Sequence, residues 1–239
     1  MSAKTPYTIT RSCRKTVAIH ILESAAIEVR APFGMPIADI DRFVESKDKW
    51  IRSHLEKASA RFAARSTFSL GYGSTITLFG KDYPITADHG SGYGRSFGSG
   101  FGARFDGRSV IVPAGLDDAG VKRAVIRLYT DIAKDTLGER AAHFAGLMGV
   151  VPACIKINGA KARWGSCSGC NSINFSWRLV MADEDVVDYV VVHELAHIRE
   201  LNHSPRFWAV VEGILPNYAD SRRTLRLLQE KLAAEDWDD

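Results

Sequence analysis

His193-Glu194-Leu195-Ala196-His197 places two histidines four residues apart. On an α-helix, residues i and i+4 lie on the same face, so the two imidazoles can bind one metal ion together. Glu194 lies one residue away from that face, where its carboxylate can reach a water molecule on the metal. Two imidazoles, a general base and an open coordination position are the arrangement of a zinc hydrolase. We therefore predict a helix that binds Zn²⁺, the alternative being an accidental motif whose histidines pack or face solvent.

A catalytic zinc site usually has a third protein ligand, and two downstream residues are candidates for it. His203 lies about 15 Å of helical rise beyond His193, so it can reach the same ion only if the helix ends between Ile198 and Asn202 and the chain turns back. Glu200 would stay on the metal face of an unbroken helix, but roughly 10 Å along the axis from His193. We expect His203 to be the ligand. Glu200 either replaces it or orients a ligand from outside the coordination sphere.

The composition is that of an ordinary soluble protein. Of 239 residues, 46% are hydrophobic and 25% are charged, and the formal net charge is +3. That charge is too small to indicate nucleic-acid binding by itself, although Lys and Arg exceed Asp and Glu in residues 1–80. No run of about 18 apolar residues predicts a transmembrane helix, and the N-terminus lacks the apolar core of a signal peptide. We expect a cytoplasmic protein.

The cysteines of a cytoplasmic protein are expected to be reduced thiols. Cys167 and Cys170 form a C-x-x-C pair, but a structural zinc site would need a second ligand pair, and none stands at a usual spacing. A redox role has little else to support it. We interpret Cys167 and Cys170 as ordinary thiols, together with Cys13 and Cys154.

The first half of the chain is predicted to be a strand-rich α+β region. Alternating apolar residues at 17–29 indicate strands, a helical period between Pro36 and Ala60 indicates a helix, and short strands are expected at 75–79 and 83–86. Residues 88–107 are rich in glycine without a phosphate-binding pattern, which favours a flexible loop. Pro113-Ala114-Gly115 marks the expected boundary between this region, residues 1–115, and a catalytic domain, residues 116–239.

The second half is predicted to begin with a long helix from Asp117 to about Met148, capped by Asp117 or Asp118 and broken near Gly138. A hairpin of residues 155–164 and 172–179 should follow. Acidic residues 183–185 then open the metal helix. The valines at 186–192 have strand propensity, but two histidines at i and i+4 need a helix to converge. Ser204 and Pro205 indicate the start of another helix, and leucines at 225–232 indicate a last one.

Several residues outside the histidine motif are candidates for contact with a substrate. An exposed edge of the strand ahead of the metal helix could hold an extended peptide by main-chain hydrogen bonds. A guanidinium at Arg163 near the metal could stabilise an oxyanion, a carboxylate or a phosphate. Asn174 and Tyr218 are the other candidates. Tyr218 either donates to an oxyanion or has a structural role, whereas Trp164, Phe175 and Trp177 are interpreted as core aromatics.

Four motifs together resemble the YgjP-like metallopeptidase family, which is allied to the SprT-like and WLM zinc peptidases. They are Arg163-Trp164-Gly165-Ser166-Cys167-Ser168, Ile173-Asn174-x-x-Trp177-Arg178-Leu179, Val191-Val192-His193-Glu194-Leu195-Ala196-His197, and Leu201-Asn202-His203-Ser204-Pro205-x-Phe207-Trp208. The resemblance implies zinc bound by His193, His197 and His203, with Glu194 as general base. Cys170 departs from the family pattern, which would have a polar or basic residue there. Metzincins are excluded, because Glu200 stands where they place glycine and no methionine turn is evident.

The fold class that the resemblance implies is α+β. We expect a zincin-like catalytic domain with a small mixed sheet and the H-E-x-x-H helix, preceded by the N-terminal strand-rich α+β region. The predicted function is that of a zinc-dependent metallopeptidase, which cleaves peptide bonds in a peptide or protein substrate with activated water and a glutamate base.

Two alternatives remain open at this point. The same site could belong to a metal-dependent phosphohydrolase acting on nucleotide phosphoanhydrides, with Lys161, Arg163 and Arg178 binding phosphates, although three histidines favour Zn²⁺ over Mg²⁺. Alternatively, because SprT-like relatives act on protein bound to DNA, the basic N-terminal half could recognise nucleic acid as part of a nucleic-acid-associated protease or binding module. A membrane partner is not expected, and the oligomeric state is not predicted.

Overall fold

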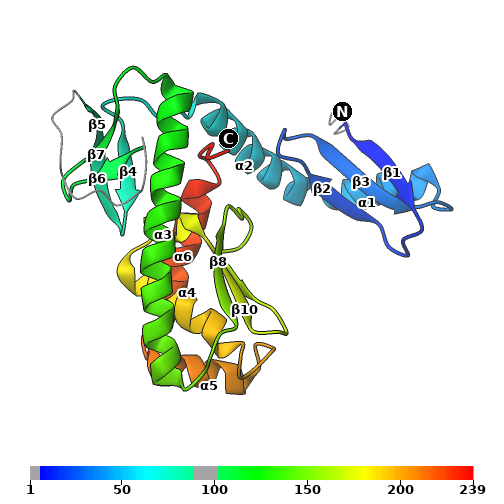
Figure 1. Cartoon of the computed structure of the whole chain (residues 1–239). Coiled ribbons are helices and arrows are strands. Elements are labelled where there is room, and N and C mark those ends of the chain that lie inside the picture. Colours follow the sequence, from blue (N-terminus) through cyan, green and yellow to red (C-terminus); the bar gives the residue numbers. More distant parts are fainter. Residues whose placement is uncertain (1–5, 89–101, 239) are drawn as a thin grey trace. The chain divides into compact units, whose positions relative to one another are not determined.

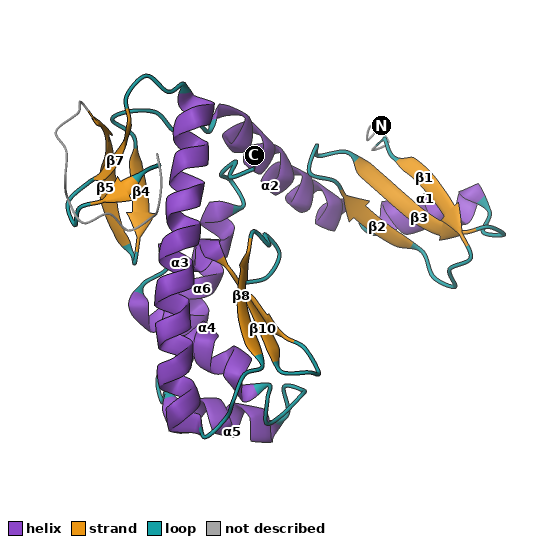
Figure 2. Cartoon of the chain, in the orientation of Figure 1, coloured by secondary structure: helices purple, strands orange, loops and turns teal. Residues whose placement is uncertain are grey.

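The computed structural model describes residues 6–88 and 102–238, so most of the predicted glycine-rich loop, residues 89–101, lies outside the described residues. The chain forms two compact units, Met1–Phe68 with Lys231–Asp236, and Ser69–Glu230 with Trp237–Asp239. The predicted division into an N-terminal region, residues 1–115, and a catalytic domain, residues 116–239, stays a prediction. Helices are combined with small separate sheets in the described residues (Figure 2), so the fold class is α+β, as predicted.

The first unit is a small sheet with two helices. Its strands are β1 (Thr8–Ser12), β2 (Ala18–Ile21) and β3 (Ile27–Pro32), and the central strand β3 is parallel to β1 and antiparallel to β2. The single helix predicted between Pro36 and Ala60 is instead two, α1 (Ile37–Ser46) and α2 (Asp48–Thr67), because Lys47 between them leaves helical geometry. The expected alternation of β3 is confirmed by the buried core, which consists of Ile27, Val29, Ala31, Ile40, Val44 and Ile51.

The second unit begins with a four-stranded sheet ordered β4-β5-β7-β6. The strands predicted at 75–79 and 83–86 are confirmed as β4 and β5, which form an antiparallel pair, whereas β5 and β7 run parallel. Alternate residues of β4 and β7 are buried, as the period of two requires. The bounds are β4 (Thr75–Leu78), β5 (Lys81–Asp88), β6 (Arg104–Phe105) and β7 (Val110–Pro113).

The long helix predicted after this sheet is α3 (Asp118–Met148), which runs beside the metal helix (Figure 1). Asp117 caps it, since its carboxylate accepts a hydrogen bond of 2.8 Å from the Gly120 N–H. The break predicted near Gly138 is wrong. A single glycine costs a helix only about 1 kcal/mol, and burial of the neighbouring Leu137 and Ala141 offsets that cost.

A mixed three-stranded sheet precedes the metal helix, and it corrects the predicted hairpin. Its strands are β8 (Cys154–Asn158), β9 (Gly165–Cys167) and β10 (Ser172–Ser176), ordered β8-β10-β9. The antiparallel partner of β10 is β9, whereas β8 pairs with β10 in parallel. β10 also ends at Ser176, where a 3-10 helix (Trp177–Met181) begins, so the strand predicted to reach Leu179 is shorter. The central β10 has no free edge, and the edges of this sheet are β8 and β9.

The metal helix is α4 (Glu184–Ala196), followed by α5 (Pro205–Ile214) and α6 (Tyr218–Leu232). Its valines at 186–192 are buried between neighbouring elements, so tertiary packing overrides their preference for strands. Ser204 caps α5 as predicted, because its hydroxyl accepts a hydrogen bond from the Phe207 N–H. None of the helices in the described residues combines the length and apolarity required to cross a membrane.

Candidate metal centre

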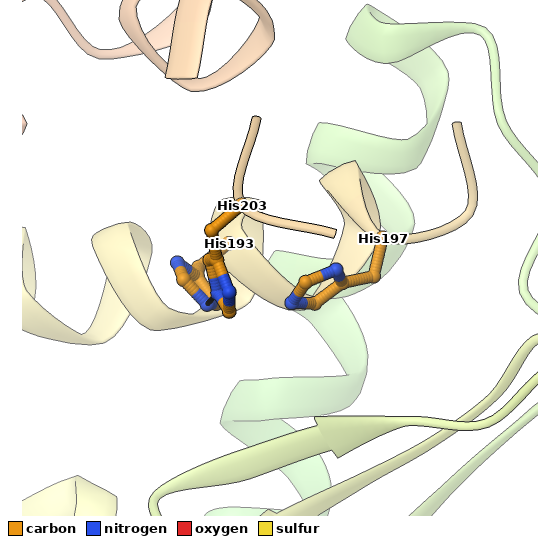
Figure 3. Close-up of side chains that lie close together, drawn as sticks. All are labelled: His193, His197 and His203. Carbon is orange, nitrogen blue, oxygen red and sulfur yellow. Dashed lines mark hydrogen bonds between the residues drawn. The ribbon is translucent and has the colours of Figure 1, made fainter. Parts of the chain in front are cut away.

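The three histidines predicted as ligands lie close together (Figure 3). One side-chain nitrogen from each of His193, His197 and His203 lies within 4.8 Å of the other two. The Nε2 atoms of His193 and His203 are 3.0 Å apart. α4 supplies His193 and, at its C-terminal cap, His197, whereas His203 is on the loop to α5.

The chain leaves the helix earlier than predicted. α4 ends at Ala196, whereas the expected end was between Ile198 and Asn202. One further turn follows, in which the Glu200 N–H donates to the Ala196 carbonyl at 3.0 Å. The expectation that the chain must turn back to bring His203 to His193 is met, because their ring centroids are 5.0 Å apart.

The donor set and its spacing fit zinc. Imidazole nitrogens at about 2.0–2.1 Å from a tetrahedral zinc ion are about 3.3 Å from one another. The observed separation of 3.0 Å between His193 and His203 and the limit of 4.8 Å for the whole group are close to that arrangement. Three imidazole ligands also suit Zn²⁺, which is of borderline softness, better than Mg²⁺, which prefers oxygen ligands.

Burial keeps the imidazoles of His193 and His197 in the form that binds a metal. Burial, then the neighbouring His197 and His203, and then the charge of Arg222, lower the pKa of His193 to about 3. The pKa of His197 is also lowered, chiefly by burial. A histidine must be neutral to donate a lone pair, so His193 and His197 can bind a metal at neutral pH.

Glu200 contacts the site through its backbone. The carbonyl oxygen of Glu200 accepts a hydrogen bond of 3.1 Å from Nδ1 of His197. This bond fixes the tautomer in which Nε2 of His197 carries a lone pair, which is the usual way a ligand histidine is oriented. The group of possible metal ligands in the described residues contains His203 and not the Glu200 carboxylate.

Glu194 is a buried carboxylate beside the histidines, with only 6% of its surface exposed. Burial raises its pKa from 4.5 to about 7, and a hydrogen bond from the Cys167 N–H partly opposes that rise. The backbone of β9 lies directly against it: a Cβ atom on Gly165 would be 2.6 Å from Cγ and Oε1 of Glu194. A carboxylate with a pKa near neutrality, held in one position, has the properties of a general base.

Aromatic rings surround the histidines. His193 lies 5.8 Å from the ring of Tyr189 and 5.8 Å from that of Trp208, measured between centroids. Tyr218, on α6, stacks on both of these rings, at 6.2 Å from Tyr189 and 5.3 Å from Trp208. Of the predicted substrate contacts, Tyr218 is therefore the one that the structure places one ring away from the histidines.

The other predicted contacts are not joined to the histidines by any described interaction. Arg163 is exposed in the loop before β9. Asn174 pairs with Ser166 across β9 and β10, and strand alternation puts both on the face of the sheet opposite to that of Gly165. Their roles at the site stay predictions. The four cysteines, Cys167 and Cys170 among them, are free thiols in the structure.

The sequence interpretation missed two contributions to the site. One is the β9 backbone at Gly165 and Cys167, and only the R-W-G-S-C motif could have drawn attention to it. The other is Arg222, whose positive charge reaches His193. Its signal was its position four residues after Tyr218, which puts both side chains on one face of a helix.

Comparisons with known proteins identify two similar structures and one family. The structure is similar to the metallopeptidase zymogen of Pyrococcus abyssi abylysin, with 21% identity over 41% of this chain and 97% of that chain and a TM-score of 0.36. It is also similar to the metallopeptidase zymogen of Methanocaldococcus jannaschii jannalysin, with 19% identity over 40% and 96% of the two chains and a TM-score of 0.35. No curated protein sequence matches the chain. The model of the YgjP-like metallopeptidase domain matches residues 15–227, and the chain therefore belongs to the YgjP-like metallopeptidase family.

Proposed function

We propose that this protein is a zinc-dependent peptidase in which His193, His197 and His203 hold the metal and Glu194 is the general base. One observation carries the proposal: three imidazoles converge beside a buried carboxylate whose pKa is raised to about 7. This combination suits hydrolysis by activated water, and membership of a metallopeptidase family supports a peptide bond as the target.

Each residue has a definite task in the proposed reaction. When bound, zinc would act as a Lewis acid that polarises the scissile carbonyl and makes water more acidic. Glu194 takes a proton from the attacking water as the new C–O bond forms. It then donates that proton to the amide nitrogen as the C–N bond breaks. A pKa near 7 suits both steps, because the carboxylate gives up the proton as readily as it takes it. Tyr218 is the proposed donor to the carbonyl oxygen.

The edge strand β9 is the proposed support for the peptide. The Ser176 N–H donates to the Trp164 carbonyl, and the Ser168 N–H donates to the Ser172 carbonyl. The backbone groups of Trp164 and Ser168, at the two ends of β9, therefore point toward β10. The alternation of an antiparallel ladder then directs the backbone groups of Gly165 and Cys167 away from β10. One of them, the Cys167 N–H, donates to Glu194. An extended peptide pairing with this edge would pass beside the general base.

The phosphohydrolase alternative is less well supported by the basic residues invoked for it. Arg178 is buried and donates to the carbonyls of Gly159, at 2.7 Å, and Trp237, at 3.3 Å. Lys161 pairs with Asp238. Two of the three cations expected to bind phosphate therefore already have partners within the protein.

The test is to incubate zinc-loaded wild type and the Glu194→Gln variant with unfolded protein and nucleoside triphosphates, and to identify products by mass spectrometry. New peptides from wild type alone are expected. Nucleoside monophosphates from wild type alone would replace the peptidase with a phosphohydrolase. Equal peptide release by both proteins would show that Glu194 is not the base.

A further inference from the structure

Arg222 lies beside the candidate metal centre. It is four residues after Tyr218 on α6, so both side chains leave the same face of the helix. The guanidinium carbon of Arg222 is 5.1 Å from the centroid of the Trp208 ring. That ring is in turn 5.8 Å from His193 and 5.7 Å from His203. One indole ring therefore separates the guanidinium from two of the proposed ligands.

The charge of Arg222 is not neutralised within the described part of the chain. No ion pair or hydrogen bond of its guanidinium is found among residues 6–88 and 102–238, and its side chain is exposed. Its neighbour Arg223 differs, because it donates to Asp220 at 2.7 Å. A cation beside a site for a divalent metal ion favours the binding of an anion, because both positive charges attract it.

Contact with Trp208 alone does not explain the position of this charge. A guanidinium over an indole ring at an exposed site contributes only about 0.5–1 kcal/mol. The planar guanidinium keeps its hydrogen-bond donors free while it stacks on a ring, and these donors match the two oxygens of a carboxylate. The aromatic group of Tyr189, Trp208 and Tyr218 thus holds the guanidinium near the site with its donors available.

We propose that Arg222 is a specificity-determining residue that selects peptides with a carboxylate one or two residues from the scissile bond. This inference rests on the proposed peptidase function. One residue of extended chain spans about 3.3–3.6 Å, so a carboxylate at that separation can reach across the width of one aromatic ring. The carboxylate comes either from an Asp or Glu side chain or from a free C-terminus, and both present the same pair of oxygens to the guanidinium.

The experiment compares the cleavage of matched peptides by zinc-loaded enzyme. One series places Glu, Gln or Lys at each position within two residues of the cleaved bond, and a second ends in a free carboxylate or an amide two residues beyond it. The variants are Arg222→Gln, Arg222→Glu and Arg223→Gln. Arg223 is the matched control, because it is the neighbouring arginine and is paired with Asp220.

Wild type is expected to cleave the carboxylate peptide with the higher kcat/KM. Arg222→Gln should lower the ratio of kcat/KM for the carboxylate peptide to that for the neutral peptide about tenfold, because one charged hydrogen bond is lost. Arg222→Glu should reverse the preference toward the lysine peptide, which a merely structural residue would not do. Arg223→Gln should keep the wild-type ratio. The series that shows the effect identifies a side chain or a chain end as the source of the carboxylate.

A binding measurement separates failure of this inference from failure of the proposed function. Zinc-loaded Glu194→Gln is titrated calorimetrically with the same peptides, with and without Arg222→Gln. Equal affinity for carboxylate and neutral peptides, with equal cleavage ratios in wild type and Arg222→Gln, would overturn the inference while leaving a peptidase. Preferential binding that depends on Arg222 would support the inference even if wild type cleaved none of the peptides, an outcome that would count against the proposed function alone.

Discussion

The backbone of Gly165 packs directly against the side chain of Glu194. A Cβ atom at position 165 would lie 2.6 Å from Cγ and Oε1 and 2.8 Å from Cδ of Glu194. Real Cβ atoms do not approach other atoms so closely, so position 165 must be glycine as long as Glu194 keeps its place. The position of the proposed base therefore depends on a glycine in the edge strand β9.

Gly165→Ala is expected to displace Glu194 and to lower kcat at least tenfold, because small misplacement of a catalytic group has large effects on rate. Zinc content should stay near that of wild type, since the three atoms nearest to a Cβ at position 165 all belong to Glu194 and none to a histidine. Gly169→Ala, where a Cβ meets nothing within 4 Å, is the matched control. Steady-state kinetics and metal analysis measure both.

A double-mutant cycle tests the contact itself. Glu194→Ala removes the atoms that the new Cβ would meet, so Gly165→Ala should destabilise the Glu194→Ala protein less than it destabilises wild type. Equal destabilisation in both backgrounds, measured by urea denaturation, would mean that the two positions are not in contact.

Glu194→Gln is expected to lower kcat by about 10²–10⁴, the usual contribution of a general base. The amide cannot accept the proton of the attacking water, but it is nearly isosteric, so the variant should retain zinc. Glu200→Gln is the comparison, because Glu200 reaches His197 through its backbone carbonyl, which the substitution leaves in place. A loss of activity in Glu200→Gln as large as that in Glu194→Gln would assign a chemical role to the Glu200 carboxylate instead.

Zinc is expected to bind at one ion per chain and to raise the thermal unfolding temperature, because a ligand that binds only the folded state stabilises it. His203→Ala should weaken zinc binding at least tenfold, whereas His143→Ala, an exposed histidine on α3, should leave it unchanged. Competition with a chromogenic chelator measures both affinities. An unchanged zinc affinity of His203→Ala would mean that another group, such as Glu200, is the third ligand.

In the metal-free protein, the burial of Glu194 should make the free energy of unfolding depend on pH. Its pKa is raised from 4.5 to about 7, so between these values the folded state binds more protons than the unfolded state. The contribution of Glu194 to the free energy of unfolding therefore falls as the pH rises through this range. Metal-free Glu194→Gln should gain about 3 kcal/mol relative to wild type between pH 4 and pH 8.

The comparison with Glu194→Gln isolates this carboxylate from the histidines. The pKa values of His193 and His197 are lowered, so their contributions change in the opposite sense, but they do so in both proteins. Urea denaturation in the presence of a chelator gives the free energies. A difference between the two proteins that does not vary with pH would show that the carboxylate is not buried as described.

Local sequence patterns predicted many of the helices and strands of this protein. The spacing of His193 and His197 required a helix, and α4 is helical despite its valines. The alternation of Ile27 and Val29 predicted a half-buried strand, and capping signals at Asp117 and Ser204 predicted the starts of α3 and α5. Each of these depends on residues a few positions apart, whose relative geometry the helix or strand itself fixes.

Which segments of the chain meet could not be predicted from local patterns. Strand alternation does not specify a partner, so β8 could be expected to pair with β10 in a hairpin, whereas β9 takes that place and β8 lies parallel on the other side. The approach of Gly165 to Glu194, and of Arg222 to Trp208, joins residues from separate elements. The chemical groups of the histidine motif and their local geometry follow directly from the order of its residues. Packing between distant segments decided how deeply Glu194 is buried and which side chains surround the site, because both depend on what each element is packed against.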